Sequence, residues 1–411
     1  MSGARAPLPA LAVAAALALG SAVSLGLARF SYGLLLPLMR SDLGWSYFTA
    51  GAMNTVNAAG YLAGALGAPV CLRRFGARPL LIASTAATAL ALAAHGVVSN
   101  DVPLYALRLF TGVGSAFSLV AGAVMAAQLG GVPGGPQVGA SAGTARGDVP
   151  AGLVVGLYYG GTGVGIVASA GLVPLLGGGA GAHAWQPAWI GLGATALLAT
   201  LVLAWATRGR GDGTSGGAAR ADARDRFEWQ AFAPGLVAYL LFGLGYIGYM
   251  TFVVTLLREQ HMTSALITAF FAMLGLAVIA SSWIWAGMLQ RFRGGESLSL
   301  LNGLLAVATA LPVISARPLA VFASGLLFGA VFLSIVSSTT SLVRHNLAAT
   351  LWPAGIAAFT VVFAAGQIVG PALAGLIADR FGGLRAGLGC SAAVLALAAL
   401  CAWRQKPLRA A

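Results

Sequence analysis

Twelve long apolar segments recur along the sequence, and they limit what this chain can fold into. About 20 consecutive apolar residues span the hydrocarbon core of a bilayer as an α-helix. Only 8% of the 411 residues are charged, whereas soluble proteins carry about 25%. The sequence therefore predicts an all-α integral membrane protein with twelve transmembrane helices. We expect them near residues 10–38, 48–71, 79–98, 103–129, 151–175, 187–206, 232–257, 264–289, 297–315, 319–343, 353–377 and 387–403.

The positive charges indicate how these helices are oriented. With the N-terminus in the cytoplasm, sixteen of the 23 Lys and Arg residues face the cytoplasm and five face outward, while Arg29 and Arg108 fall inside helices. Cytoplasmic loops carry an excess of Lys and Arg, so we expect a multi-pass protein of the bacterial inner (plasma) membrane with both termini in the cytoplasm. The basic residues lie between apolar segments, so the net charge of +13 does not indicate a nucleic-acid partner.

The longest polar stretch, residues 207–230, divides the chain into two halves. It contains five Arg, four acidic residues and several Gly, a composition that favours a flexible linker. It lies on the cytoplasmic side between predicted helices six and seven. We therefore expect an N-terminal six-helix bundle, residues 1–206, and a C-terminal six-helix bundle, residues 231–411.

The two halves resemble each other weakly in sequence. Gly26 and Tyr32 of the first predicted helix align with Gly243 and Tyr249 of the seventh at a single offset of 217 residues. Duplicated halves are common in transporters, which place the substrate site at the interface of the repeats near the bilayer midplane. The alignment favours two pseudo-symmetric bundles around a central cavity.

Predicted helix four carries a more specific pattern. Leu104 is followed by Arg108, and then by Gly112, Gly114 and further small residues. This pattern resembles the fourth-helix motif of the major facilitator superfamily, although Thr111 stands where Gln is usual. The resemblance implies a twelve-helix transporter that works by alternating access. It also implies that Arg108, with Thr111 beside it, acts in proton coupling or as a structural anchor for neighbouring carbonyl groups.

Two further stretches resemble one branch of this superfamily. Residues 29–39 begin Arg-Phe-Ser-Tyr and end Leu-Pro-Leu-Met, and residues 54–64 begin Asn-Thr-Val-Asn. Both are similar to the YbfB/YjiJ-type branch, which implies little about the substrate. With the helix count and the basic loops, the resemblance covers nearly the whole chain.

Two loop motifs are candidates for gates. The superfamily motif after helix two has an Asp at the position that Arg73 occupies here, so a cytoplasmic gate formed by Arg73, Arg74 and Arg78 departs from the usual pattern. A better copy, which includes Asp379 and Arg380, follows predicted helix eleven and therefore faces outward. Inverted three-helix repeats account for a copy at that position. We expect an outer gate there; the alternative is a salt bridge at a helix end.

Glycine-rich stretches occur in predicted helices five and eleven, at residues 156–165 and 366–375. The second resembles the glycine-proline motif of superfamily exporters, which normally lies in helix five. Small residues allow helices in a membrane to approach closely. We interpret both stretches as packing surfaces and do not infer drug export from them.

Polar residues at helical spacing define the candidate substrate site. Residues three, four or seven apart share a face of a helix, and polar stripes of this kind line a cavity in an otherwise apolar bundle. The candidates are Arg29 and Tyr32, Asn54 and Asn57, Tyr246 and Tyr249, and Gln367. Hydrogen bonds between helices are the alternative for the Asn residues, and aromatic packing is the alternative for Tyr246 and Tyr249. For a serine stripe between Ser334 and Ser341 we favour hydrogen bonding between helices.

The positions of the acidic residues favour an anionic substrate over a cationic one. All ten Asp and Glu residues fall in predicted loops or at helix ends, whereas Arg29 lies far from both ends of a long helix. A mid-membrane Arg costs about 2.5–3.5 kcal/mol on insertion scales, and a buried cation requires a counter-ion. Arg binds carboxylates with two parallel hydrogen bonds. We therefore expect Arg29 to bind a small organic anion as substrate, with Arg108 as a second candidate for the same role.

Other functions are less consistent with the sequence. Clustered His, Asp, Glu or Cys within the helices would indicate a membrane enzyme or a metal site, and no predicted helix has such a cluster. No cofactor is expected. The P-loop motif of ATP-driven pumps is absent from the sequence. A proton-driven exporter of hydrophobic or drug-like compounds is one alternative, and a transporter-like sensor is another. We expect a monomer in the lipid bilayer that moves a small molecule, with co-transport of a proton left open.

Overall fold

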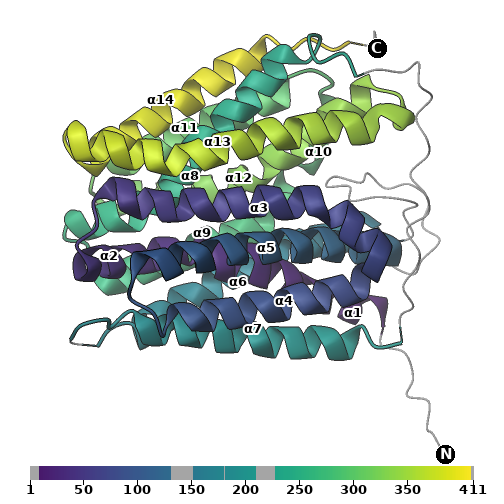
Figure 1. Ribbon diagram of the computed structural model, residues 1–411. Helices are drawn as coiled ribbons and strands as arrows, with labels where there is room; N and C mark the ends of the chain where they lie inside the picture. The colour runs from purple at the N-terminus through teal and green to yellow at the C-terminus, as the bar shows by residue number, and fades with distance from the viewer. Residues whose placement is uncertain (1–8, 131–150, 180, 210–226, 409–411) are drawn as a thin grey trace, which may run out of the picture.

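The computed structural model describes residues 9–130, 151–179, 181–209 and 227–408, and every regular element in these ranges is a helix (Figure 1). Twelve spans are long and apolar enough to cross a membrane, which confirms the predicted number. The first half contains α1 (Ala10–Ser21), the π-helix η1 (Ala22–Phe30), α2 (Tyr32–Leu43), α3 (Tyr47–Phe75), α4 (Ala77–His95), α5 (Asp101–Leu129), α6 (Ala151–Leu176) and α7 (Gln186–Ala206). The second half contains α8 (Ala233–Glu259), α9 (Ser264–Ile284), α10 (Ala286–Arg291), α11 (Glu296–Ile314), α12 (Pro318–Asn346), the short 3₁₀-helix η2 (Ala349–Leu351), α13 (Trp352–Arg380) and α14 (Leu384–Trp403).

The helices form two six-helix bundles, as expected. In Figure 1 the purple and blue helices α3, α4 and α5 lie in the lower half, and the yellow-green helices α13 and α14 lie above them. The bundles meet mainly where α3 packs against α13 and where α6 packs against α9. Most of the predicted linker, 210–226, and most of the loop between α5 and α6 fall outside the described residues.

Equivalent helix pairs pack closely in the two bundles. In the first, Gly161 of α6 lies so near α1 that a Cβ atom would stand 1.9 Å from the carbonyl oxygen of Ala18. In the second, a Cβ atom on Gly366 of α13 would stand 2.3 Å from the carbonyl oxygen of Leu240 in α8. Backbone-to-backbone contact of this kind requires glycine. This close contact explains the glycine-rich stretches of predicted helices five and eleven. It also occurs at equivalent positions in the two bundles, against the first span in one and the seventh span in the other.

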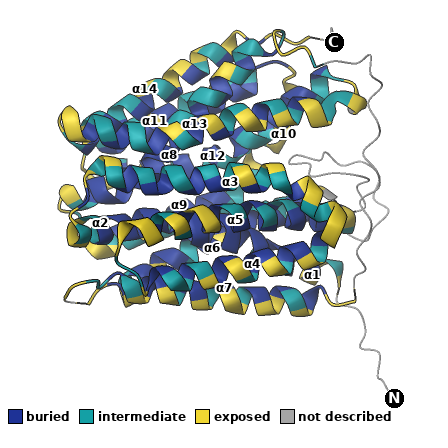
Figure 2. Ribbon diagram, in the orientation of Figure 1, coloured by how far each residue is buried: buried dark blue, intermediate teal, exposed yellow. Residues whose placement is uncertain are grey.

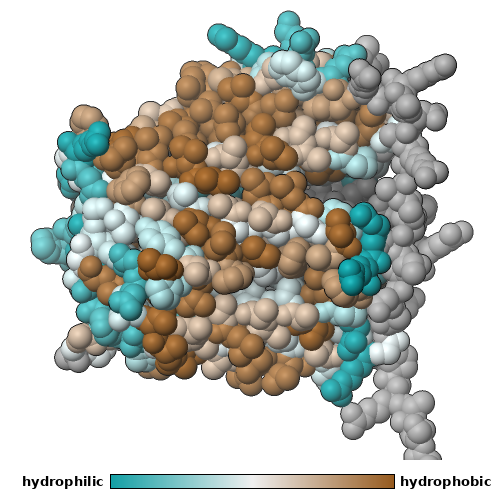
Figure 3. Space-filling view, in the orientation of Figure 1, coloured by the Kyte–Doolittle hydropathy of each residue, from teal (hydrophilic) through white to brown (hydrophobic). Residues whose placement is uncertain are grey.

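The outer surface of the bundles is apolar. Exposed residues lie on the outward sides of the helices (Figure 2), and brown apolar side chains cover much of the face seen in Figure 3. Leu66, Phe110 and Leu198 are each more than 60% exposed. Exposed apolar side chains on this scale are typical of a surface that contacts lipid rather than water.

Two spans depart from the regular α-helices that the sequence predicts. The first span is wound as a π-helix over Ala22–Phe30, with the backbone N–H of Ser31 bonded to the carbonyl of Gly26 five residues earlier. The eighth span is interrupted at Trp285, whose indole N–H donates to the carbonyl oxygen of Ala330 at 2.7 Å. π-Helical segments occur frequently at functional sites. Both irregular segments contribute residues to the cavity described next.

Candidate functional site

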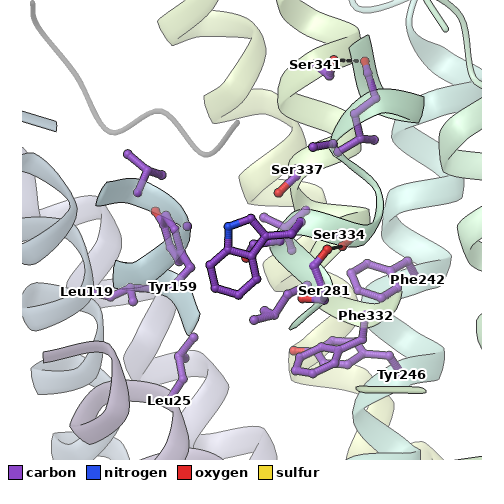
Figure 4. A pocket seen from close by; sticks show the side chains of 18 of the residues that line it. Leu25, Leu119, Tyr159, Phe242, Tyr246, Ser281, Phe332, Ser334, Ser337 and Ser341 are labelled. Atoms are coloured by element: carbon purple, nitrogen blue, oxygen red, sulfur yellow. Dashed lines mark hydrogen bonds between the residues drawn. The ribbon is translucent and has the colours of Figure 1, made fainter. Parts of the chain in front are cut away.

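A cavity of about 510 Å³ lies between the two bundles. It begins at mid-membrane side chains of η1, α8 and α13 and extends to the end of the molecule at which α6 begins and α12 ends. Cavities of about 300–1,000 Å³ accommodate drug-sized ligands. Figure 4 shows Leu25, Leu119 and Tyr159 of the first bundle on one side and Phe242, Tyr246 and Phe332 of the second on the other.

Arg29 is the one charged residue among the described residues that line this cavity. It stands near the end of η1 and is 3% exposed. Its Nη2 atom donates a hydrogen bond to the side-chain amide oxygen of Gln367, and its Cζ atom lies 5.3 Å from the ring centre of Tyr61. Its Nε atom is buried without a hydrogen-bond partner among the described residues. Because a guanidinium has five N–H donors, the described residues satisfy only part of its hydrogen-bonding capacity.

A set of stacked aromatic rings forms the opposite wall. The ring of Phe242 is stacked on Tyr246, with centres 4.7 Å apart, and on Phe363, with centres 5.3 Å apart. Tyr246 is also stacked on Phe332, at 6.1 Å. Gln367 follows Phe363 by four residues on α13, so both side chains share a helix face. The partner of Arg29 therefore lies beside the aromatic wall.

Serine side chains line the cavity between this wall and its open end. Ser334 donates to the carbonyl oxygen of Ser281 at 3.2 Å, and Ser341 donates to that of Leu289 at 2.7 Å (Figure 4). These are the hydrogen bonds between helices that we expected for the stripe. Ser337, which also lines the cavity, presents a neutral hydroxyl group.

Arg108 lies outside the cavity lining and is held by protein groups. Its Nη1 donates to the carbonyl oxygen of Ala28 at 3.0 Å, its Nη2 to Oδ1 of Asn54 at 2.8 Å, and its Nε to the carbonyl oxygen of Met53 at 3.5 Å. The Cζ atom also lies 4.6 Å from the ring centre of Tyr32. These contacts join η1, α3 and α5, which is the arrangement expected of a structural anchor. A role in proton coupling stays a prediction.

The two candidate asparagines hydrogen-bond to neighbouring helices. Asn57 donates to the carbonyl oxygen of Arg108 at 3.0 Å and to the hydroxyl of Thr111 at 3.2 Å. Asn54 donates to the hydroxyl of Thr251 in α8 at 2.7 Å and so connects the two bundles. Neither lines the cavity. The alternative of hydrogen bonding between helices describes both side chains in this conformation, and contact with substrate stays a prediction.

Tyr32 and Tyr249, which the repeat alignment pairs, also lie away from the cavity lining. The hydroxyl of Tyr32 donates to the carbonyl oxygen of Ala50 at 2.8 Å. The hydroxyl of Tyr249 is hydrogen-bonded to that of Ser324 at 2.6 Å, and its ring is stacked on Phe328. Both are fully buried. Of the seven substrate-site candidates, Arg29, Tyr246 and Gln367 line the cavity, and their contact with substrate is likewise a prediction.

The opposite end of the interface is closed by contacts between the bundles. Asp379, at the end of α13, accepts hydrogen bonds from the backbone N–H groups of Tyr47 and Phe48 at the start of α3, at 2.9 and 2.8 Å. The hydroxyl of Tyr47 donates to the carboxylate of Glu259 in α8. The Cζ atom of Arg40 lies 3.7 Å from the centre of the Tyr47 ring. A carboxylate at a helix N-terminus satisfies free N–H groups and the helix dipole. Asp379 thus caps a helix of the other bundle.

Within the described part of the chain, the remaining gate candidates make no comparable contact between bundles. Arg380 is exposed beside Asp379, and Arg73 and Arg74 are exposed at the end of α3. Arg78 donates to the carbonyl oxygens of Thr207, at 2.9 Å, and Ala204, at 3.3 Å, and so caps the end of α7 in its own bundle. Gating by these residues stays a prediction.

Several cavity residues were not among the predicted site residues. Tyr159 and Phe332 are aromatic residues within apolar segments, so their composition does not distinguish them from residues that face lipid. Phe363 was detectable, because it lies between Thr360 and Gln367 on one face of its predicted helix. Trp283 and Gln290 reach the cavity beside the break at Trp285, which has no Pro or other clear sequence signal. Tyr61 was detectable, because it lies seven residues after Asn54 on the polar stripe of α3.

Comparisons with known proteins identify the family and the fold of the chain. A family model described as the uncharacterised MFS-type transporter YbfB matches residues 21–403. No curated protein matches the chain.

Solved transporter structures share the fold. A bacterial homologue of the human lysosomal transporter Spinster, inward-facing and unoccupied, has a TM-score of 0.70 at 13% identity over 96% of each chain. The nucleoside transporter NupG has a TM-score of 0.68 at 12% identity, over 97% of this chain and 99% of its own. The human organic anion transporter MFSD10 has a TM-score of 0.60 at 15% identity, over 96% and 100%. At these identities the similarity shows the fold alone.

Proposed function

Because the chain belongs to the major facilitator superfamily, in the branch of the uncharacterised YbfB-type transporters, we propose that it carries a small organic anion across the membrane by alternating access. The family is one of membrane transporters and not of enzymes. One observation carries the proposal: Arg29 is a buried cation in the wall of the central cavity, and its hydrogen-bond acceptor among the described residues is a neutral amide.

The charge of Arg29 supports an anionic substrate. In the described part of the chain, the ion pair within 4.0 Å joins His183 and Asp42, so Arg29 has no carboxylate partner there. Removing an unpaired charge from water is costly, and an opposite charge within the same site reduces that cost. A carboxylate that enters the cavity meets a guanidinium whose fork matches its two oxygen atoms. The substrate anion is then the counter-ion of Arg29.

The position of the cavity supports the transport cycle. We propose that residues 1–206 and 231–411 move as two bodies joined by the linker 207–230, and that both termini face the cytoplasm of a bacterial inner membrane. In this orientation the cavity opens to the cytoplasm, and the contacts of Asp379 with α3 close the outer end. Outward opening then requires those contacts to break.

Uptake into proteoliposomes tests the proposal. Purified protein is first screened by thermal shift against a panel of organic acids, and anions that stabilise it are then supplied as labelled substrates. We expect Arg29→Gln to abolish both stabilisation and uptake and Arg29→Lys to retain part of them, because Lys keeps the charge but not the fork. Arg385→Gln, at an exposed residue near the outer end, is the matched control. Undiminished uptake by Arg29→Gln would exclude Arg29 as the binding residue.

A second candidate function is export of hydrophobic or drug-like compounds. The observation that favours it is the aromatic wall of Phe242, Tyr246, Phe332 and Phe363. The same assay separates the two functions when neutral and cationic dyes are supplied beside the anions. Transport of cationic dyes that is unaffected by Arg29→Gln would favour the exporter.

A further inference from the structure

Resting on the proposed function, we infer that the substrate is an aromatic monoanion: one carboxylate that binds Arg29, and a flat aromatic body that packs on the rings of Phe242, Tyr246 and Phe363. The juxtaposition that carries this inference is Gln367, which contacts Arg29 and lies one helical turn from Phe363.

The charges of the cavity lining limit the substrate to one negative charge. Arg29 is the charged group among the described lining residues, and the side chains that contact it, Gln367 and Tyr61, are neutral. A second carboxylate of a dianion would be removed from water without a cation to bind it. Dicarboxylates are therefore disfavoured by the same site that favours monocarboxylates.

The rings of the opposite wall indicate an aromatic body. Phe242 and Phe363 are almost parallel, at an interplanar angle of 8°, and Tyr246 is inclined to Phe363 by only 17°. Aromatic rings stack preferentially at centroid distances of about 4.5–7 Å, and this wall presents several rings in one orientation. Tyr159 faces it from the first bundle (Figure 4). A flat ligand therefore has aromatic partners from both bundles.

The size and the rim of the cavity complete the substrate class. A volume of about 510 Å³ fits a drug-sized ligand better than a short-chain acid. Between the wall and the open end, the hydroxyl of Ser337 and the hydrogen-bonded hydroxyls of Ser334 and Ser341 are neutral. They suit an uncharged polar substituent on the far side of the aromatic body.

A set of matched ligands tests the inference by equilibrium binding to purified full-length protein. Naphthoate is compared with its saturated decalin carboxylate, its neutral amide, naphthalenedicarboxylate and butyrate. Stacking adds about 0.5–1.5 kcal/mol beyond area burial, so we expect naphthoate to bind up to about tenfold tighter than the saturated acid. The amide, the dicarboxylate and butyrate are expected to bind more weakly than naphthoate.

Variants that lack one aromatic ring test which side chains contact the aromatic body of the ligand. Phe363→Leu is expected to lose the preference for naphthoate over the saturated acid while it still binds both acids. Phe359→Leu is the matched control, because Phe359 is a buried aromatic residue of the same helix that does not line the cavity. Should Phe363→Leu fail to fold, Phe242→Leu with the same ligand pair measures the same preference.

The outcomes separate this inference from the function on which it rests. Equal binding of the aromatic and saturated acids, or tight binding of the dicarboxylate, overturns the aromatic monoanion and leaves an Arg29-dependent anion transporter intact. Failure of every acid to bind in an Arg29-dependent manner overturns both. Loss of the aromatic preference in Phe359→Leu as well as in Phe363→Leu also overturns the assignment of the wall.

Discussion

Arg29 and Gln367 are hydrogen-bonded across the interface of the two bundles, with Nη2 of the arginine donating to the amide oxygen of the glutamine. Arg29 lies in the first span and Gln367 in α13, 338 residues later. An anion that binds Nη2 of Arg29 would compete with this hydrogen bond, which joins the two bundles. In the proposed function, substrate binding and the conformational change would both involve this pair of side chains.

Substitutions of Gln367 test whether a bound anion competes with the hydrogen bond from Arg29. Gln367→Glu places a carboxylate beside Arg29, so we expect anion affinity to fall at least about tenfold, equivalent to about 1.4 kcal/mol. Gln367→Leu removes the competing acceptor, and anion affinity is expected to stay equal or increase. Titration of purified protein with a stabilising anion measures both. Equal affinities of the two variants would contradict direct competition.

Arg29 and Arg108 differ in what they contribute to stability. Arg108 donates to three protein oxygen atoms, and a hydrogen bond to a charged group contributes about 1.5–3 kcal/mol. We therefore expect Arg108→Leu to lower the Tm in detergent. Arg29→Leu removes a buried, poorly satisfied charge and is expected to leave the Tm unchanged or to raise it. A lower Tm for Arg29→Leu than for Arg108→Leu would contradict these roles.

Asp379 is expected to hold the outer end closed. Loss of a helix cap costs about 0.5–2 kcal/mol, so Asp379→Ala should increase the fraction of molecules open to the outside. A Thr55→Cys reporter is then labelled faster by a membrane-impermeant maleimide, because the hydroxyl of Thr55 on α3 donates to the carbonyl oxygen of Ile368 on α13 and so lies at the contact between the bundles.

The matched control for that measurement is Asp101→Ala. Asp101 is also an outer carboxylate, but it accepts from the indole of Trp45 within the first bundle. The Asp101→Ala substitution should leave the labelling rate of the Thr55→Cys reporter unchanged. Equal acceleration of labelling by both substitutions would indicate a general loss of stability and not the specific loss of the contacts between Asp379 and α3.

Two glycines of α6 should respond oppositely to alanine. A Cβ atom on Gly161 would collide with the backbone of α1, whereas a Cβ atom on Gly171 would meet nothing within 4 Å. We expect Gly161→Ala to lower the Tm and Gly171→Ala to raise it slightly, since Ala in a helix is favoured over Gly by about 0.5–1 kcal/mol. Thermal unfolding of the two proteins in one detergent provides the comparison, and a tolerated Gly161→Ala would contradict the close contact.

The spans and the location of Arg29 were predictable because both depend on local composition. Apolar length alone defines a transmembrane helix, and a lone arginine far from both helix ends has to face protein or a cavity. Gln367 was also detectable, because it repeats at helical spacing after Thr360 and Phe363.

The remaining features depend on contacts between distant segments. The cap that Asp379 places on α3 joins residues more than 330 positions apart, and its acceptor role at backbone amides leaves no trace in the sequence around Tyr47. The π-helical winding before Arg29 and the hydrogen bond from Asn57 to the carbonyl of Arg108 are likewise determined by neighbouring helices.

The unpaired charge of Arg29 also has an electrical consequence. In the proposed transport cycle, the central site is neutral with the anion bound, and the empty site carries one positive charge that is exposed first to one side of the membrane and then to the other. Moving one charge through the full membrane potential changes the energy by about 2.3 kcal/mol per 100 mV. An inside-negative potential should therefore hold the empty carrier open to the cytoplasm, and the voltage of the cell would act on the return step, when no cargo is present.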